Sequence, residues 1–370
     1  MNNLVIICAI LLLVLLFLKV PVYIAVLSAS AVYFIGTPGM NLSIFAQKTI
    51  SGAEGLSLLA IPFFVCAGIF MNYTGVTKRI MNCCEVLTAR MPGGLAQVNI
   101  LLSTLMGGLS GSSLADAAMQ CKMLVPTMES KGYSKSFSTV ITAASGMVVP
   151  LIPPGVGLII YGCINNISIG KLFIAGIGPG IVLCVTLMIF THFLSKKRGY
   201  LPSRTTKIPV SEKIAAVRPA FLPLLLPIII IGGVRIGVFT ASEAGTVAIV
   251  YAVLLGLLYK ELTLKNVMQG CKETVTTTAS IMLIVAAATC FSWILTKEQI
   301  PQQFSQWMIS NIHNKYVFLI MVNIFLLIVG MFIEGNASMI VLAPLLHPVA
   351  MAYGIDDIHF AMVYIFNCTI

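Results

Sequence analysis

Charged residues are scarce in this sequence. They make up only 9% of its 370 residues, whereas hydrophobic residues make up 58%. So few charges cannot cover a water-soluble surface, and the mean hydropathy of +1.01 excludes an ordinary globular domain. The formal net charge of +10 would suggest nucleic-acid binding in a soluble protein. Here the basic residues lie in short segments between apolar runs, so we expect a lipid bilayer as partner and no nucleic acid.

The sequence also lacks the motifs of metal and nucleotide chemistry. It contains no C-x-x-C, no H-E-x-x-H and no G-x-x-x-x-G-K-[ST]. Its ten cysteines are scattered through apolar runs, and we interpret them as small buried hydrophobic residues. Segment 108–112 resembles a nucleophile elbow, but Ser112 stands where that motif needs glycine. We therefore expect no transition-metal site, no covalently bound cofactor, no ATP hydrolysis and no enzymatic activity.

Long apolar runs are what the sequence has in abundance. Several approach the roughly 20 residues that cross a bilayer core as a helix. They show none of the alternation of a barrel strand, so we predict an all-α, polytopic membrane protein. The first run has no basic segment before it and continues past Lys19 into a second run, so it is interpreted as the first membrane segment and not as a signal peptide. The runs are 4–17, 20–35, 58–71, 172–194, 221–233, 246–258, 281–295 and 317–332.

A basic segment divides the chain near its middle. Within 196–218 seven basic residues are opposed by Glu212 alone, and such a bias is typical of a cytoplasmic loop. The sequence therefore predicts a first membrane half at 1–195, a basic cytoplasmic loop at 196–218 and a second membrane half at 219–370. The basic residues are Lys196, Lys197, Arg198, Arg204, Lys207, Lys213 and Arg218.

Each half contains an apolar segment that is interrupted by small or polar residues. The first interruption lies at 107–113 and the second at 334–338. Two pairs of residues share one offset, Pro126 with Pro348 and Gly132 with Gly354, because 348 − 126 = 354 − 132 = 222. That offset places Ser112 opposite Glu334 and Ser145 opposite Asn367, which predicts two repeats with re-entrant helical hairpins.

A proline-rich break follows the first interruption, at 142–155, where three prolines and two glycines cannot continue a regular helix. Irregular backbone at membrane depth is tolerated where it lines a cavity, and paired breaks in two halves indicate a transporter's binding site. The alternative for the glycines and serines of 107–113 is close packing of helices. For the carboxylates Asp116 and Glu334 the alternative is a helix end at the membrane interface.

At these residues the sequence resembles the large membrane subunit of tripartite ATP-independent periplasmic (TRAP) transporters, the DctM-like or SiaM-like family. The matching stretches run through most of the chain, and together they are specific. They are 58–72, 110–116, 142–145 with 152–154, 232–244, 297–301 and 330–334.

The resemblance implies a subunit of the bacterial inner membrane that imports small organic acids, such as C4-dicarboxylates or sialic acid, with a sodium gradient. It also implies two partners, a periplasmic solute-binding protein and a small four-helix membrane subunit, and an elevator-type fold with inverted repeats. The family pattern continues past a second proline-rich break, whose counterparts here would be positions 372, 375 and 376. The second half is therefore expected to be truncated at its C-terminus.

If sodium is the coupling ion, oxygen ligands at the two breaks are its expected partners, because an unwound segment offers carbonyls beside hydroxyls. For the substrate carboxylate we expect helix N-termini in the same cavity. The predicted sodium ligands are Ser110, Ser112, Ser145, Gly146, Val149 and Pro150 in the first half, and Glu334, Asn336, Asn367 and Thr369 in the second. The predicted substrate-binding residues are Ser113, Asp116, Pro153 and Pro154.

Three alternatives stay open at this point. A self-sufficient sodium-coupled anion symporter of similar architecture would differ by transporting without a binding protein. An intramembrane enzyme would need a catalytic pair within hydrogen-bond reach. A purely structural membrane subunit is disfavoured by the broken helices and the carboxylates inside the membrane.

Overall fold

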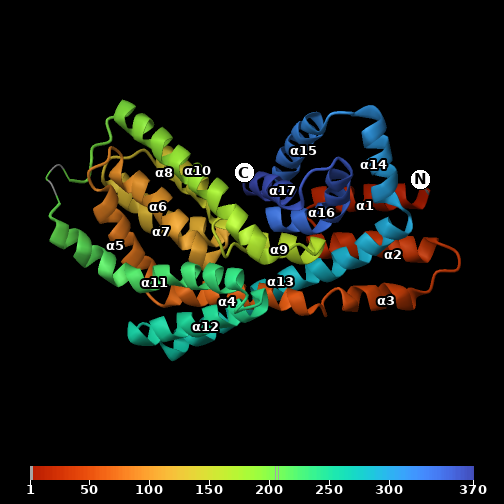
Figure 1. The fold of residues 1–370 in the computed structure, drawn as a ribbon, viewed down its shortest axis with the longest axis horizontal. Coiled ribbons are helices and arrows are strands. Elements are labelled where there is room, and N and C mark those ends of the chain that lie inside the picture. The colour runs from red at the N-terminus through yellow and green to blue at the C-terminus, as the bar shows by residue number, and fades with distance from the viewer. Residues whose placement is uncertain (1–2, 205, 207) are drawn as a thin grey trace.

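The fold is all-helical over the residues that the computed structural model describes, which are 3–204, 206 and 208–370. No strand occurs among these residues, as the all-α prediction requires (Figure 1). The helices are α1 (Asn3–Phe17), α2 (Val22–Gly36), α3 (Leu42–Ser51), η1 (Leu56–Leu59), α4 (Ala60–Tyr73), α5 (Val76–Thr88), α6 (Gly94–Ser110), α7 (Ser113–Ser130), α8 (Lys135–Gly146), η2 (Val149–Leu151), α9 (Val156–Asn165), α10 (Ile169–Lys197), α11 (Val210–Ile236), α12 (Ala241–Leu258), α13 (Leu264–Lys297), α14 (Ile300–Asn311), α15 (Lys315–Gly330), α16 (Gly335–Ala352) and α17 (Asp357–Thr369).

Length and composition make this a multi-pass membrane protein. Within the described residues six helices are long and apolar enough to cross a bilayer, or seven if the pair 135–151 and 156–165, bent by 43°, counts as one span. The outer faces of these helices are apolar. On α10, for example, Ile181, Val182 and Phe193 are exposed. Water would penalise such a surface, whereas lipid tails do not, so the exposed faces are the lipid-facing ones.

The repeat predicted from the offset of 222 is present in the helix boundaries. Helix α7 spans Ser113–Ser130 and α16 spans Gly335–Ala352, and 335 − 113 = 352 − 130 = 222. Helices α8 and α17 begin 222 residues apart, at Lys135 and Asp357. Gly132 and Gly354 both have positive φ, +86° and +70°, so the same turn joins each helix pair. Figure 1 shows α6–α8 and α15–α17 on opposite sides of the centre, where the C-terminus also lies.

The basic segment is shorter as a loop than predicted. Helix α10 continues to Lys197 and α11 begins at Val210, so Lys213 and Arg218 are helical. Lys207 lies outside the described residues. The backbone of the loop is tied to the first repeat, because Arg204 donates to the carbonyl of Ala89 at 2.9 Å and Gly93 donates to that of Tyr200 at 3.1 Å. Turning the chain back over α5 and α6 requires only the short stretch between α10 and α11.

Candidate functional site

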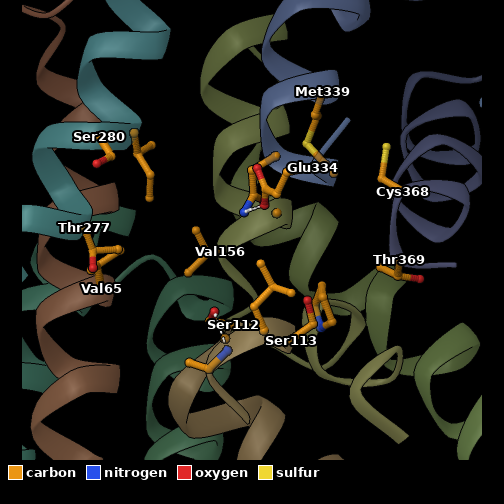
Figure 2. Close-up of a pocket in the computed structure, with 18 of the residues that line it drawn as sticks. Val65, Ser112, Ser113, Val156, Thr277, Ser280, Glu334, Met339, Cys368 and Thr369 are labelled. Atoms are coloured by element: carbon orange, nitrogen blue, oxygen red, sulfur yellow. Dashed lines mark hydrogen bonds between the residues drawn. The ribbon is translucent and has the colours of Figure 1, made fainter. Parts of the chain in front are cut away.

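A cavity of about 590 Å³ lies where the tips of the two hairpins meet. The first tip joins α6 to α7, the second joins α15 to α16, and helices α4 and α13 form the facing wall. Figure 2 shows Ser112 and Ser113 across from Glu334, with Thr277 and Ser280 on the neighbouring helix. Six of the predicted site residues line this cavity: Ser112, Ser113, Pro150, Glu334, Asn336 and Thr369.

Ser112 ends the break in the first tip by capping α7. Its side chain accepts a hydrogen bond from the backbone N–H of Ala115 at 3.4 Å. Gly111, one residue earlier, has φ +63°, which terminates α6 in a left-handed turn. The cap is neutral, so it places no negative charge at the cavity end of α7. The acidic residue in the first turn of α7, Asp116, is buried and does not line the cavity. The side chain of Ser110, a predicted sodium ligand, lies outside the described part of the structure.

Glu334 holds the equivalent position in the second tip, but its cap is charged. One carboxylate oxygen accepts from the backbone N–H of Ala337 at 3.0 Å. The other accepts from the side-chain amide of Asn336 at 2.8 Å. The α16 N-terminus is thus already neutralised by its own residue, and a negative side chain is exposed in the cavity.

The wall opposite the tips was missed by the sequence predictions. It carries a run of polar residues on α13, Thr276, Thr277 and Ser280, together with Asn72 at the end of α4. The signal was present in the sequence as a threonine run inside an apolar helix. Because hydroxyls in a helix can bond to the preceding turn, such a run does not by itself distinguish a site from a satisfied membrane helix.

The proline-rich break packs against the glycines that end α6. A Cβ on Gly107 would lie 3.0 Å from the carbonyl oxygen of Val149, and one on Gly111 would lie 2.9 Å from that of Pro154. Gly108 stands in the same relation to Pro153, at 3.0 Å. Carbonyl oxygens of the break therefore lie against the C-terminal end of a half-helix, which gives that end the partial negative charge that a cation prefers. Val149, Pro153 and Pro154 do not themselves line the cavity.

Asp116 lies away from the cavity, inside the first hairpin, in contrast to its predicted contact with substrate. Its side chain is 1% exposed. One carboxylate oxygen accepts from Ser103 Oγ at 2.8 Å and from Gln120 Nε2 at 2.5 Å, while the other has no hydrogen-bond partner. No basic side chain among the described residues forms an ion pair with it. This buried carboxylate therefore lacks a visible counter-charge, which a bound cation or a proton would supply.

Ser145, a predicted sodium ligand, belongs to the same polar cluster. Its hydroxyl contacts Ser103 Oγ at 3.0 Å and donates to Asn99 Oδ1 at 2.8 Å. Gly146 lies closer to the tip, since a Cβ there would be 3.4 Å from the carbonyl oxygen of Ser113. The cluster thus connects the buried carboxylate to the end of α8 beside the first tip.

Comparison with known proteins identifies the family. Residues 9–370 match the family described as the tripartite ATP-independent periplasmic transporter, DctM component. The chain belongs to this family. It is 41% identical over 357 residues to the sialic acid TRAP transporter large permease protein SiaM of Vibrio cholerae, covering 96% of this chain and 83% of that one.

Two further relatives of this TRAP permease carry other substrate names. The 2,3-diketo-L-gulonate TRAP transporter large permease protein YiaN of Escherichia coli is 36% identical over 95% of this chain and 82% of its own length. The C4-dicarboxylate TRAP transporter large permease protein DctM of Pseudomonas aeruginosa is 36% identical over 88% of this chain and 76% of its own.

In this TRAP permease the two repeats also place equivalent polar pairs behind their tips. Asn367, the predicted counterpart of Ser145, is buried and donates to Asn323 Oδ1 at 2.6 Å. Ser145 donates in the same way to Asn99. In each repeat, therefore, the helix that follows the hairpin, α8 or α17, donates a hydrogen bond to an asparagine on the first helix of the hairpin, α6 or α15. Asn367 does not line the cavity. Its position favours a supporting contact behind Thr369, and Thr369 does line the cavity.

Proposed function

We propose that this chain is the large membrane subunit of a sodium-driven importer of small organic acids in the bacterial inner membrane. A periplasmic binding protein delivers the substrate, and a small four-helix membrane subunit assembles with this chain. The observation that carries the proposal is the cavity in which one hairpin tip presents a helix N-terminus with a neutral serine cap and the other presents a carboxylate. An organic anion and a cation are the ligands that such a pair fits.

The substrate carboxylate binds at the first tip. Backbone N–H groups at a helix N-terminus are donors without intrahelical partners, and the helix dipole favours an anion there. Ser112 and Ser113 add hydroxyls, and the polar wall of Thr277 and Ser280 accepts the remaining polar groups of the substrate. The named relatives carry a sugar acid, a keto sugar acid or a C4-dicarboxylate, so a carboxylate is what their substrates share.

Sodium binds on the oxygen-rich side of each tip. Glu334 supplies a negative charge at the second tip, and the carbonyls of the proline-rich break supply partial charges at the first. Asp116 supplies the full charge of the first repeat from behind the tip. A cation and an anion held in one water-restricted cavity each lower the electrostatic cost of binding the other, and this mutual effect couples uptake to the sodium gradient. Movement of the two hairpins as one body past α4 and α13 then gives alternating access of the elevator type.

The decisive experiment reconstitutes the complex in liposomes with a sodium gradient and binding protein loaded with sialic acid. We expect uptake to require all three proteins and to stop when sodium is replaced by choline or when an ionophore dissipates its gradient. Robust uptake by this chain with the small subunit alone would instead favour the self-sufficient symporter. Uptake that follows a pH gradient and ignores sodium would refute sodium coupling and leave the family assignment intact.

A further inference from the structure

A second cavity, of about 480 Å³, lies on the other side of Ile340 from the first. Ile340 lines both cavities, and both follow the same helix: Thr277, Ser280 and Ile284 of α13 face the first, and Ala288, Ser292 and Thr296 face the second. These positions recur every three or four residues, so they occupy one face of α13. The two cavities are therefore consecutive along one wall and share Ile340 of α16 in their linings.

The second cavity lies at the end of the molecule away from the basic segment. Asn166, which lines it, comes just before α10, and the basic segment comes just after α10. Helix α10 has 29 residues and is about 43 Å long, which is more than the thickness of a bilayer core. With the basic segment in the cytoplasm, the second cavity faces the periplasm.

Two lysines without acidic partners lie near Trp293, which lines this cavity. Lys48 lines the cavity too, whereas Lys297 lies outside the lining and contacts Met40 Sδ at 3.1 Å. Lys48 Nζ lies 5.9 Å from the centre of the Trp293 ring, and Lys297 Nζ lies 5.5 Å from the same centre. Neither forms an ion pair with a described acidic residue. Glu298, the nearest acid in sequence, accepts a hydrogen bond from the Tyr33 hydroxyl. Both ammonium groups add positive potential beside Trp293, so an anion bound in the cavity there is favoured electrostatically.

The cavity beneath the lysines also offers donors that the fold does not use. No hydrogen bond within the described residues engages the side chain of Asn166 or Ser292, although both line the cavity. Asn166 is held there by its left-handed conformation, φ 55°, which ends α9. A cation, an amide and a hydroxyl in the lining, with a second cation on the same indole, match a small carboxylate with further polar groups.

We propose that Lys48, Trp293 and Lys297, with the cavity beneath them, form a second binding site for the organic anion on the periplasmic side. The inference rests on the proposed function, since it takes the same class of substrate. The anion binds here after leaving the binding protein and enters the first cavity when movement of α16 displaces Ile340. If the two lysines only held their charges in water at the helix ends, small anions would not bind beside them.

Tryptophan fluorescence tests this site without transport. The chain has two tryptophans, so Trp307→Phe leaves Trp293 as its only indole, and Trp293→Phe identifies any signal from the small subunit. We expect sialic acid or succinate to change the fluorescence of the purified Trp307→Phe complex. Adding Lys48→Gln and Lys297→Gln should weaken this binding by roughly fivefold or more, as expected for loss of two partly exposed charge interactions. The matched control, Lys260→Gln with Lys265→Gln near the inner end of α13, should leave it unchanged.

Transport measurements separate the inference from the proposed function. In sodium-driven uptake the Lys48→Gln, Lys297→Gln variant should need a higher substrate concentration at a nearly unchanged maximal rate. Sodium-driven uptake with no anion-dependent Trp293 signal would overturn the second site alone. A Trp293 signal that the lysine substitutions reduce, beside uptake that ignores sodium, would support the site while refuting the proposed coupling. If the lysine substitutions weakened only docking of the binding protein, the lysines would be a protein contact and the proposal would be wrong.

Discussion

Replacing Glu334 by glutamine separates its charge from its structural role. The glutamine side-chain oxygen can still accept from Ala337 N–H, which Glu334 does at 3.0 Å, so the N-cap of α16 persists. The interaction of a full charge with the helix dipole is lost, which amounts to about 0.5 kcal/mol at an exposed site. The exposed hydrogen bond from the Asn336 amide is also lost, because the glutamine NH2 group cannot accept it. The thermal stability of the complex should therefore fall little.

The effect on sodium should be much larger. A unit charge about 6 Å from the ion, at an effective dielectric constant of about 40 for a partly hydrated cavity, contributes roughly 1.4 kcal/mol. That free energy corresponds to about a tenfold change in an equilibrium constant. We expect Glu334→Gln to raise the sodium concentration for half-maximal uptake about tenfold. Glu334→Ala should show the same shift and an additional loss of stability of about 1 kcal/mol from the missing cap.

Asp356 provides a matched control. It caps α17 with the same chemistry, its carboxylate accepting from Ile358 N–H at 2.9 Å and from His359 N–H at 3.0 Å, but it does not line the cavity. Asp356→Asn should reproduce the small change in stability without the sodium effect. The assay is uptake by reconstituted complexes over a range of sodium concentrations at constant ionic strength. A wild-type sodium response in Glu334→Gln would refute the assignment of this carboxylate to the ion.

Three further predictions concern the first tip and the topology. Ser112→Ala should raise both the substrate and the sodium concentrations needed for half-maximal uptake, whereas Ser134→Ala, which removes an equivalent cap from α8, should change stability by about 1 kcal/mol without either shift. Gly111→Ala should abolish uptake, because a Cβ at φ +63° would lie 2.9 Å from the carbonyl oxygen of Pro154. The control Gly132→Ala, at φ +86° with open space around it, should carry only the penalty of a left-handed backbone, about 1–2 kcal/mol. Equal effects of the two variants on uptake would contradict a role for the tip. In a Cys271→Ser background, which removes the exposed native cysteine, Ser203→Cys should resist impermeant thiol reagents added from the periplasmic side, and ready labelling there would reverse the topology.

The features that sequence predicted well are those that local rules determine. The offset of 222, predicted from the sequence, also relates both ends of α7 to both ends of α16, because turn glycines and capping residues fix helix boundaries. Cytoplasmic placement of the basic segment and the inverted orientation of the repeats remain predictions, although the hairpins flank the centre from opposite sides (Figure 1). The length of the basic loop was wrong, because Lys213 and Arg218 are good helix formers that extend α11 beyond its apolar run.

Contacts between distant segments were harder to predict. Asp116 follows Ser112 by four residues, which suggested that both face the cavity. Helix α7 begins at Ser113, however, and turns Asp116 toward Ser103 on α6, with Gln120 one turn further on the same face. The polar wall of α13 was missed for a related reason, since nothing local reveals that a threonine run more than 100 residues downstream lies across from Ser112.

The two repeats differ in the residue that caps the second helix of the hairpin, Ser112 in α7 and Glu334 in α16. The same fold places Ser112 and Glu334 at equivalent N-caps, so backbone geometry alone would make both tips anion sites. The Glu334 cap places a negative charge in the cavity at one tip, while the Ser112 cap places none at the other. In the proposed function this difference favours the substrate anion at the first tip, whereas the charge for sodium in the first repeat comes from Asp116 behind the tip. If an anion and a cation bind in this one cavity, as proposed, occupation by either favours the other, and the serine–glutamate difference gives two similar repeats the asymmetry that co-transport of opposite charges requires.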